Sequence, residues 1–580
     1  MFENWPKWLF PDIIRIKSVL QYRRTSACTE FTFTMTINIT AVGGFGEVGR
    51  NCTAVDVDGS IVLIDLGLHL DHYIKYTEDE EGDVAGGDPE ILMRVGAIPD
   101  LRVLKESEAN VKAIVLSHAH LDHIGAVPFL VNRFKTVPIY GSAFTIALLR
   151  QLLLDRDLVP QQPLRIVKPG QRLKITAGIE LELIPITHST PDSTIVAIHT
   201  AEGSVLYAND FKLDNHPTLG QPLDLQPIRN LQGSVVALVS ECLNAPHATK
   251  TPSESVAREM LREVLLETKT SKKAVFVTTF SSHIARLKSI VEVAHALDRK
   301  PVFLGRSLAK YIFAAKEANL VDLTKDAIIV KHGSQARRFL KTLENPEQYV
   351  LITTGHQGEP RAMLSRILDE ELFKFQPEDI VVFSCNIIPV PMIQANRKAL
   401  EEKLKKAHLR VFVDVHVSGH ASREDLREFL DAVQPTYVIP SHGDPIMTKA
   451  YAELAQEQGF ANDHIFSLRE GDRITVPGIK PKHPFPSLSA ETPEEPMTDK
   501  PREVRRKRGR RGGRGRSGPR APGGPGSEAG PGEKTQVPRA PRAPAPAKGP
   551  AVIGDKPATP TKGPLDQPER KPSTGKVFKK

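Results

Sequence analysis

The segment from His118 to His123 holds three histidines and one aspartate within six residues, in the order HAHLDH. It follows Ala113–Leu116, an apolar stretch that predicts a buried strand. A tight turn at the end of a strand can direct all four side chains into one cavity. Neutral imidazoles and carboxylates are natural ligands of zinc and similar divalent ions, and burying such groups without a partner is costly. The segment therefore predicts a metal site at a strand end.

Three later residues of metal-binding type also come directly after apolar stretches: His188, Asp210 and His442. Any one of them alone is more commonly an ordinary loop residue. Ligands that follow different strands can converge on one site, however, and a site for two metal ions needs more ligands than one segment supplies. Together with the HAHLDH segment, these residues predict a binuclear metal site.

The chain from Ile37 to about Val476 alternates short apolar stretches with helical patterns, which is typical of an α/β fold. Strands are predicted at Ser60–Asp65, Ala113–Leu116, Ile179–Pro185, Ser204–Ala208, Val235–Val239, Ala274–Thr278, Tyr349–Thr353, Ile380–Ser384, Leu409–Val415 and Thr436–Pro440. Helices are predicted at Ser253–Lys269, Ser282–Ala296, Ala395–Ala407 and Arg423–Ala432.

A glycine-rich segment, GFGEVG from Gly44 to Gly49, matches the G-x-G-x-x-G pattern of dinucleotide sites. Such a site needs a helix directly after the glycines, so that its N-terminus faces the pyrophosphate. Here residues 53–58 alternate apolar and polar side chains, and Asp58-Gly59 leads into another apolar stretch. This pattern predicts a β-hairpin and excludes the dinucleotide site.

The net charge of +8 is unevenly distributed. Residues 481–580 hold 23 basic and 10 acidic side chains and 20 of the 46 prolines, so their net charge of +13 leaves −5 for residues 1–480. This composition buries too little apolar surface to fold and predicts a disordered basic tail. Its cationic stretch Arg505–Arg516 can neutralise phosphates and predicts a tether to RNA or the ribosome. A solvated tail that only promotes solubility is the alternative.

The four cysteines are widely spaced and form no C-x-x-C pair. This spacing argues against a disulfide framework and a cysteine-type zinc finger, and it fits a reducing cytoplasm. No apolar stretch approaches the roughly 20 residues that cross a bilayer. Residues 1–34 stand apart from the regular pattern, either as a segment upstream of a true start at Met35 or as a docking helix.

The motifs together resemble the metallo-β-lactamase superfamily, which carries an H-x-H-x-D-H motif. Glu241 in VSECLNA, His420 in VSGHASREDL and His442 in IPSHGD resemble the three additional motifs of the β-CASP nucleases. The segments GGFGEVGRN, THSTPDS and TGHQGEPRAMLSR are most similar to those of ribonuclease J. The resemblance covers about residues 36–480 and implies an αββα sandwich with an inserted β-CASP α/β domain.

The resemblance implies the following division of the chain: residues 1–34 as an N-terminal extension, 35–225 as the first part of the metallo-β-lactamase domain, 226–400 as the β-CASP domain, 401–480 as the second part of the metallo-β-lactamase domain, and 481–580 as the tail.

The resemblance also implies two Zn²⁺ ions per subunit, with Mn²⁺ or Mg²⁺ as alternatives in activity. One ion is expected on His118, His120, His188 and Asp210. The second ion is expected on Asp122, His123, the shared Asp210 and His442. Asp65 matches an aspartate of the family that supports the ligand loop and does not itself bind the metal strongly.

Catalytic roles are carried over in the same way. Asp210 is expected to hold the two metals in place. His420 and Glu241 are expected beside the leaving 3′ oxygen, to which His420 can transfer a proton. Glu241 either acts on the leaving oxygen as well or orients His420. Substrate contacts are expected from Ser418, Gly419, His420, Ala421, Ser281 and Arg286. The segment TTFSSHIARL resembles a phosphate-handling loop of the family, with His283 where asparagine is usual, and TGHQGEPRAMLSR has His356 where serine is usual.

The resulting hypothesis is a zinc-dependent, cytoplasmic, ribonuclease J-like enzyme of RNA decay and maturation. It is expected to degrade single-stranded RNA mainly from a 5′-monophosphate in the 5′-to-3′ direction, with endonuclease activity as a further capability. Its expected partners are RNA and, through the tail, the ribosome or RNA-decay proteins; no membrane is expected, and the resemblance allows a homodimer. One alternative is an endonuclease like the RNA 3′-end cleavage factors of the same group. The other is a small-molecule hydrolase of the superfamily, against which the motifs from Glu241 onward argue.

Overall fold

The computed structural model describes residues 36–79, 87–388 and 391–478. The predicted N-terminal extension (1–34) and the predicted basic tail (481–580) lie outside these described residues. Within the described ranges, no helix combines the length and apolar character that crossing a membrane requires.

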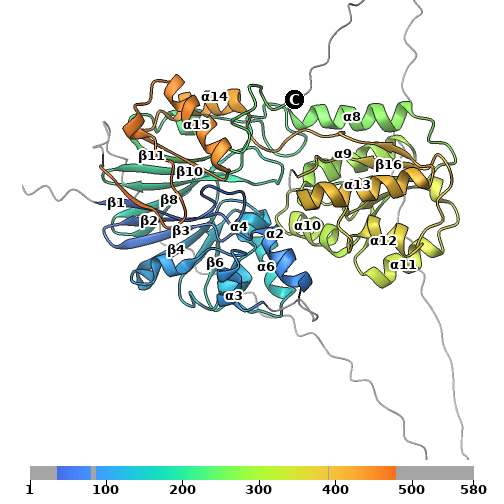
Figure 1. Ribbon diagram of the computed structural model, residues 1–580, viewed down its shortest axis with the longest axis horizontal. Coiled ribbons are helices and arrows are strands. Elements are labelled where there is room, and N and C mark those ends of the chain that lie inside the picture. The colour runs from blue at the N-terminus through green and yellow to red at the C-terminus, as the bar shows by residue number, and fades with distance from the viewer. Residues whose placement is uncertain (1–35, 80–86, 389–390, 479–580) are drawn as a thin grey trace, which may run out of the picture. The chain divides into compact units, whose positions relative to one another are not determined.

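Two mixed sheets, of seven and six strands within the described residues, form what we call the two-sheet domain (Figure 1). The first sheet has the order β19 (Arg473–Val476), β1 (Ile37–Gly43), β2 (Cys52–Val57), β3 (Ser60–Ile64), β4 (Val111–Leu116), β5 (Ile139–Gly141) and β6 (Leu164–Ile166). The second has the order β18 (Tyr437–Ser441), β11 (Val235–Glu241), β10 (Gly203–Ala208), β9 (Thr194–Thr200), β8 (Ile179–Pro185) and β7 (Arg172–Thr176).

The helices and 3₁₀ turns of this domain are α2 (Leu70–Asp79), α3 (Pro89–Arg94), η1 (Leu101–Leu104), η2 (Glu108–Asn110), α4 (Leu121–Ile124), α5 (Val127–Leu130), α6 (Ala143–Leu154), α7 (Gln226–Arg229), α14 (Arg423–Val433), α15 (Pro445–Glu457) and η4 (Asn462–His464). Figure 1 shows α14 and α15 outside the second sheet and α6 outside the first.

Apolar side chains hold these layers together. Ile39 of the first sheet and Leu183 of the second lie in one buried cluster between the sheets. On the outer face of the second sheet, Leu238 lies in a cluster with Phe429 of α14 and Leu454 of α15. Burying apolar surface on both faces of each sheet is the main driving force for such a stack. The order helix, sheet, sheet, helix confirms the predicted αββα sandwich.

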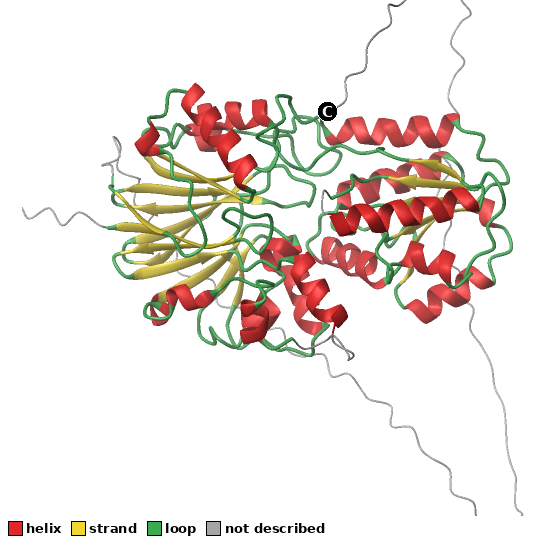
Figure 2. Cartoon of the chain, in the orientation of Figure 1, coloured by secondary structure: helices red, strands yellow, loops and turns green. Residues whose placement is uncertain are grey.

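A third sheet with helices on both faces forms the inserted domain, which we define by its strands and helices between β11 and α14 (Figure 2). All its strand pairs are parallel, in the order β14 (Ile328–Val330), β13 (Lys300–Leu304), β15 (Tyr349–Thr353), β12 (Val275–Thr278), β16 (Ile380–Phe383) and β17 (Arg410–Phe412). Its helices are α8 (Glu254–Glu267), α9 (Ile284–Ala296), α10 (Arg306–Glu317), α11 (Gly333–Lys341), η3 (Pro346–Gln348), α12 (Met363–Asp369) and α13 (Pro391–Lys406).

The strands and helices predicted from the apolar pattern are all present, with bounds that differ by a few residues. Asp58 and Gly59 connect β2 to β3 in a two-residue turn, and both have a positive φ, 46° and 78°. This geometry is that of a hairpin turn. The glycine-rich segment therefore leads into a hairpin, and the exclusion of a dinucleotide site is confirmed.

His356 is an unusual buried residue in the loop that follows β15. Neither of its ring nitrogens has a hydrogen-bond partner among the described residues, and its ring packs on Phe280 with centroids 4.1 Å apart. Burial, and then the positive charge of Arg397, lower the pKa of His356 to about 3. The imidazole is therefore neutral in the folded protein, since a charged ring here would lack a partner.

We expect His356 to make the protein sensitive to acid. In the unfolded chain a histidine has a pKa near 6.5. The stabilisation that comes from neutral His356 is therefore complete above about pH 6.5 and is lost as the pH falls toward about 3. At pH 5 this lowers the free energy of unfolding by about 2 kcal/mol. Urea unfolding of the wild type and of His356→Ser at neutral pH and at about pH 5 measures this loss. Between neutral pH and about pH 5, the free energy of unfolding of the wild type should fall by about 2 kcal/mol more than that of His356→Ser. Parallel pH dependences would contradict the prediction.

Candidate metal centre

The strand directions explain why side chains far apart in the sequence meet at one place. β3 and β4 are parallel, and so are β10, β11 and β18, while β8 lies antiparallel to β9, which is antiparallel to β10. The carboxyl ends of β8, β10, β11 and β18 therefore share one edge of the second sheet. The residues at or after the strand ends of the two sheets are Asp65 (β3), the HAHLDH segment (β4), His188 (β8), Asp210 (β10), Glu241 (β11) and His442 (β18).

Among the described residues, three groups of possible metal ligands form at this edge: two have four members, and the third consists of Asp210, Glu241 and His420. Within each group, one ligand atom from each residue lies within 4.8 Å of all the others. The first group is His118, His120, His188 and Asp210, and the second is Asp122, His123, Asp210 and His442. The structure thus brings together all seven residues predicted as metal ligands, in the same two sets, with Asp210 in both.

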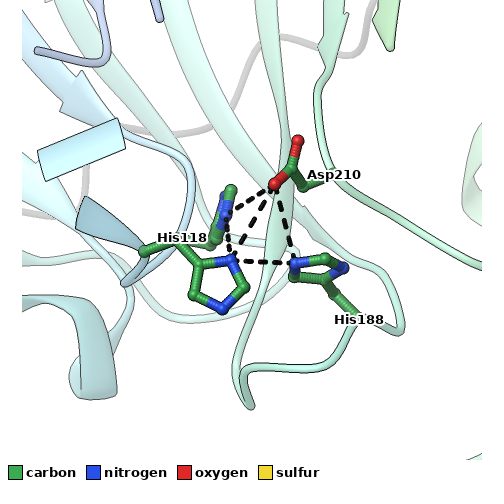
Figure 3. Close-up of side chains that lie close together, drawn as sticks. His118, His188 and Asp210 are labelled. Carbon is green, nitrogen blue, oxygen red and sulfur yellow. Dashed lines mark hydrogen bonds and ion pairs between the residues drawn. The ribbon is translucent and has the colours of Figure 1, made fainter. Parts of the chain in front are cut away.

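Asp210 lies at the centre of the site. Its Oδ2 is 3.4 Å from Nε2 of His118 and 3.7 Å from Nε2 of His188 (Figure 3). The same oxygen is 3.3 Å from Nε2 of His123. Its Oδ1 is 3.5 Å from Nε2 of His442 and has no hydrogen-bond partner among the described residues, although the side chain is buried. A buried carboxylate oxygen without a hydrogen bond is costly. A cation between these groups would satisfy it.

Three of the strand-end residues adopt a backbone conformation that side chains disfavour. The φ angles of Asp65, Asp210 and His442 are 62°, 62° and 51°, in the left-handed region. Each such residue costs about 1–3 kcal/mol, and strain of this kind concentrates at functional sites. The turn directly after each strand is therefore held in a shape that directs its side chain into the site.

The charges of the site are set by burial and by neighbouring groups. Burial, followed by the neighbouring His123, lowers the pKa of His118 to about 4. Burial raises the pKa of Asp210, but His442 and His123 outweigh it and hold that pKa well below its usual value. Burial lowers the pKa of His123, but the carboxylates of Asp210, Asp122 and Asp65 outweigh it and raise the value well above the usual one. A carboxylate and a neutral imidazole are the protonation states that bind a divalent cation.

Each of the five imidazoles in the two groups has one ring nitrogen toward the cluster and the other on an outer partner. The outer partners are Ser117 Oγ for His118 (3.0 Å), Ser282 Oγ for His120 (3.1 Å), Asp65 Oδ2 for His123 (2.7 Å), the Gly419 carbonyl for His188 (2.7 Å) and Asn51 for His442 (2.9 Å to Oδ1). Metal-binding histidines nearly always donate their second N–H to such a partner. The donor set therefore fits bound metal.

His420 and Glu241 form a hydrogen-bonded pair beside Asp210. Nδ1 of His420 is 2.7 Å from Oε2 of Glu241, and Oε1 of Glu241 accepts the backbone N–H of Phe211 at 2.7 Å. Glu241 is fully buried and His420 is partly exposed. Burial lowers the pKa of His420, but Glu241 and Asp210 outweigh it and raise the value to about 9. The pair is thus oriented from the protein interior, with the imidazole at the accessible end.

The residues around His420 divide into two kinds. Ser418 Oγ accepts the backbone N–H of His420 at 3.1 Å and an N–H of Asn244 at 3.3 Å. At Gly419 a Cβ atom would lie 2.6 Å from Cβ of Ser189, so only glycine fits. The side chain of Ala421 is buried in the apolar cluster that includes α14, so the substrate contact expected of Ala421 stays a prediction that only its backbone could fulfil.

Arg286 is held by partners within the protein. Its side chain is fully buried, and its guanidinium donates to both carboxylate oxygens of Glu254 at 2.6 and 2.9 Å and to Ser384 Oγ at 2.7 Å. These are the partners that a buried charge requires, and the substrate contact expected of Arg286 stays a prediction. His283, the departure from the family asparagine, also contacts Glu254, at 3.2 Å. Ser281, the other expected contact of this loop, is largely buried.

Sequence reasoning missed the roles of Asn51 and Ser282. Asn51 lies in the GGFGEVGRN segment, whose glycines match the G-x-G-x-x-G pattern. Its buried amide contacts both His123 and His442. Ser282 lies in the segment taken for a phosphate loop, yet its hydroxyl contacts His120. The motifs gave a signal that these segments matter, but only the folded structure shows contacts across 391 and 162 residues of sequence.

Three family models match the chain: "Ribonuclease J, beta-CASP domain" over residues 272–401, "Metallo-beta-lactamase superfamily" over residues 45–260, and "Zn-dependent metallo-hydrolase RNA specificity domain" over residues 406–466. The first and third lie downstream of the match to the superfamily. Together they span most of the described residues.

Curated relatives agree with these models. Ribonuclease J of Methanocaldococcus jannaschii is 42% identical over 451 residues, which are 77% of this chain and 100% of the relative. Ribonuclease J of Pyrococcus abyssi is 39% identical over 76% of this chain and 98% of the relative. Ribonuclease J2 of Bacillus subtilis is 30% identical over 77% and 76% of the two chains.

Among solved structures, a protein of unknown function from Enterococcus faecalis V583 is similar in fold. Its TM-score is 0.52 with 15% identity, over 76% of this chain and 100% of that chain. This likeness concerns the fold alone.

Replacing Arg286 tests whether it supports the structure or contacts RNA. We expect Arg286→Met to lower the free energy of unfolding by about 3–5 kcal/mol, because Glu254 stays buried without its partner. The matched control is Arg258→Met on α8, whose ion pair with Glu259 is exposed and worth less than about 1 kcal/mol. Urea unfolding compares them. Unchanged stability of Arg286→Met together with weaker RNA binding would contradict the structural role.

Proposed function

The chain belongs to the ribonuclease J family of metal-dependent ribonucleases, and from this premise we propose that it uses two zinc ions to degrade RNA from its 5′ end. Its fold is a metallo-β-lactamase domain with a β-CASP insertion. The observation that carries the proposal is the shared, buried carboxylate of Asp210 between two sets of imidazoles whose outer nitrogens all have partners.

The residues that would hold the ions are the two groups described above. His118, His120, His188 and Asp210 would hold one ion, and Asp122, His123, Asp210 and His442 the other. When bound, two divalent ions lower the pKa of a bound water, so that it can attack as hydroxide at neutral pH, and they neutralise the charge of the phosphate. Zinc is favoured because the first set offers three histidine nitrogens and one carboxylate and the second offers two of each, all of which are zinc ligands.

His420 and Glu241 would handle the leaving oxygen. Nδ1 of His420 donates to Glu241, so Nε2 is the nitrogen left to give a proton to the departing 3′ oxygen. Because the Glu241 carboxylate is fixed by the backbone N–H of Phe211, it orients the ring during the transfer. Between the two roles left open by the sequence, this geometry favours His420 as the acid and Glu241 as the orienting group.

Ser418 and Gly419 would support the phosphate beside His420. The Gly419 carbonyl accepts the Nδ1–H of His188, so the same turn that presents His420 also orients a metal ligand. A phosphate placed on this turn would lie between the metal groups and the proton donor.

The tail residues Arg505–Arg516 would add salt-dependent attraction for RNA, and we place the activity in the cytoplasm, where RNA decay occurs.

An assay with defined RNA ends tests the direction of degradation. Purified protein with defined zinc is given end-labelled RNAs of one sequence that carry a 5′-monophosphate, triphosphate or hydroxyl, and a circular RNA. We expect mononucleotides from the monophosphate RNA, little product from the other linear ends, and an intact circle. Protein stripped of metal should release nothing.

Cleavage of the circle at a rate close to that of the monophosphate RNA would contradict the exonuclease proposal and favour an endonuclease of the 3′-end cleavage-factor type. Asp122→Ala serves as the matched inactive control, because it removes a predicted ligand of one metal group only.

A further inference from the structure

The outer partners of the five imidazoles come from different parts of the chain. Ser117, Asp65 and Asn51 belong to the two-sheet domain, and Gly419 lies in the segment that leads from β17 back into α14 of that domain. Ser282, in contrast, lies within the inserted domain, between β12 and α9. Ser282 is the partner of His120, and 162 residues separate the two in sequence. Within the described residues, one imidazole of the site therefore depends on the inserted domain for its orientation.

The positions of the ring nitrogens assign the proton of His120. Its Nδ1 lies 3.1 Å from Nε2 of His188 and 3.3 Å from Nε2 of His118, inside the first metal group. Its Nε2 lies 3.1 Å from Ser282 Oγ. A nitrogen that faces a metal needs its lone pair, so the proton must be on Nε2, from which it donates to Ser282. The serine hydroxyl thus fixes both the tautomer and the orientation of His120.

Ser282 is itself held firmly in place. It is about nine-tenths buried, and its carbonyl accepts the backbone N–H of Ile284 at 2.9 Å. The next residue, His283, contacts Glu254, which also binds Arg286. Because Glu254 begins α8 and Arg286 lies on α9, this buried ion pair fixes the loop that carries Ser282.

The second metal group has its own support. Nδ1 of His442 lies 2.9 Å from Oδ1 and 2.7 Å from Nδ2 of Asn51. Nδ2 donates to the Asp122 carbonyl at 3.2 Å and Oδ1 accepts an N–H of Asn209 at 3.4 Å, so these two bonds fix which end of the amide is the acceptor. Because Nε2 of His442 faces the metal group and needs its lone pair, the proton of the ring is on Nδ1, where Oδ1 of Asn51 can accept it. His442 therefore donates from Nδ1 and keeps the lone pair of Nε2 for the site.

We propose that Ser282 and Asn51 are positioning residues that act separately, Ser282 on the first metal group through His120 and Asn51 on the second through His442. Metal affinity of the first group then depends on the loop of the inserted domain, and that of the second group does not. The inference rests on the proposed two-metal site.

Two single-site parent proteins allow each group to be measured alone. His442→Ala removes a ligand of the second group only, and His188→Ala removes a ligand of the first group only. Zinc affinity of each parent is measured by competition with a chromophoric chelator, and the bound zinc is counted by mass spectrometry. If the parents bind no zinc, the two-metal proposal itself fails.

Opposite effects are expected in the two parents. In His442→Ala, adding Ser282→Ala should weaken zinc binding about 10- to 100-fold, and adding Asn51→Leu should change it little. In His188→Ala, Asn51→Leu should cause the loss of about the same size, and Ser282→Ala should change it little. Each variant is thus the control for the other.

A conservative variant separates positioning from a general loss of structure. Ser282→Thr keeps the hydroxyl, so it should retain the zinc affinity of the His442→Ala parent. Ser289→Ala, which removes a buried hydroxyl elsewhere in the inserted domain, should have no effect. Unchanged zinc affinity in Ser282→Ala, or an equal loss in both parents, would overturn the proposal.

Discussion

The buried carboxylate of Asp210 is the group on which the site depends. Six histidines lie within 4.0 Å of it, and one of its oxygens has no hydrogen bond among the described residues. An ionised, buried carboxylate is stable only beside positive charge. His123 and His420 supply part of that charge, because burial lowers the pKa of each but the neighbouring carboxylates outweigh it and raise the pKa. Burial lowers the pKa of His118 and His188, so these two rings are neutral at physiological pH. A bound cation would add positive charge beside the carboxylate oxygen that has no hydrogen bond, and the geometry therefore fits metal.

The fold satisfies this requirement by bringing strand ends together. Parallel neighbours place the turns after β10, β11 and β18 along one edge, and strained backbone at Asp210 and His442 directs their side chains inward. The inserted domain then adds a loop whose serine reaches His120. The same domain contributes a buried ion pair, Arg286 with Glu254, that fixes this loop. The orientation of His120 in the metal site therefore depends on a hydrogen bond from the inserted domain.

Much of this could be predicted from the sequence because ligand spacing and strand patterns are local signals. HAHLDH directly after an apolar strand predicts the metal loop, and Asp58-Gly59 predicts the hairpin. Arg286 could not be placed in this way, since its motif resembles a phosphate-binding loop whereas its actual partner, Glu254, lies 32 residues away. The roles of Asn51 and Ser282 could not be predicted for the same reason, because each depends on a contact that only the tertiary structure creates. Ala421 was grouped with its neighbours, but its side chain turns into the core.

The number of metal ions per chain tests the central claim, that Asp210 joins two separate metal groups. Purified protein is loaded with zinc, dialysed, and analysed by mass spectrometry for metal together with protein concentration. The account predicts two zinc ions for the wild type, about one for His442→Ala and for His188→Ala, and a loss at both groups for Asp210→Ala, because this carboxylate belongs to both. Two tightly bound ions in Asp210→Ala, or fewer than two in the wild type, would contradict it.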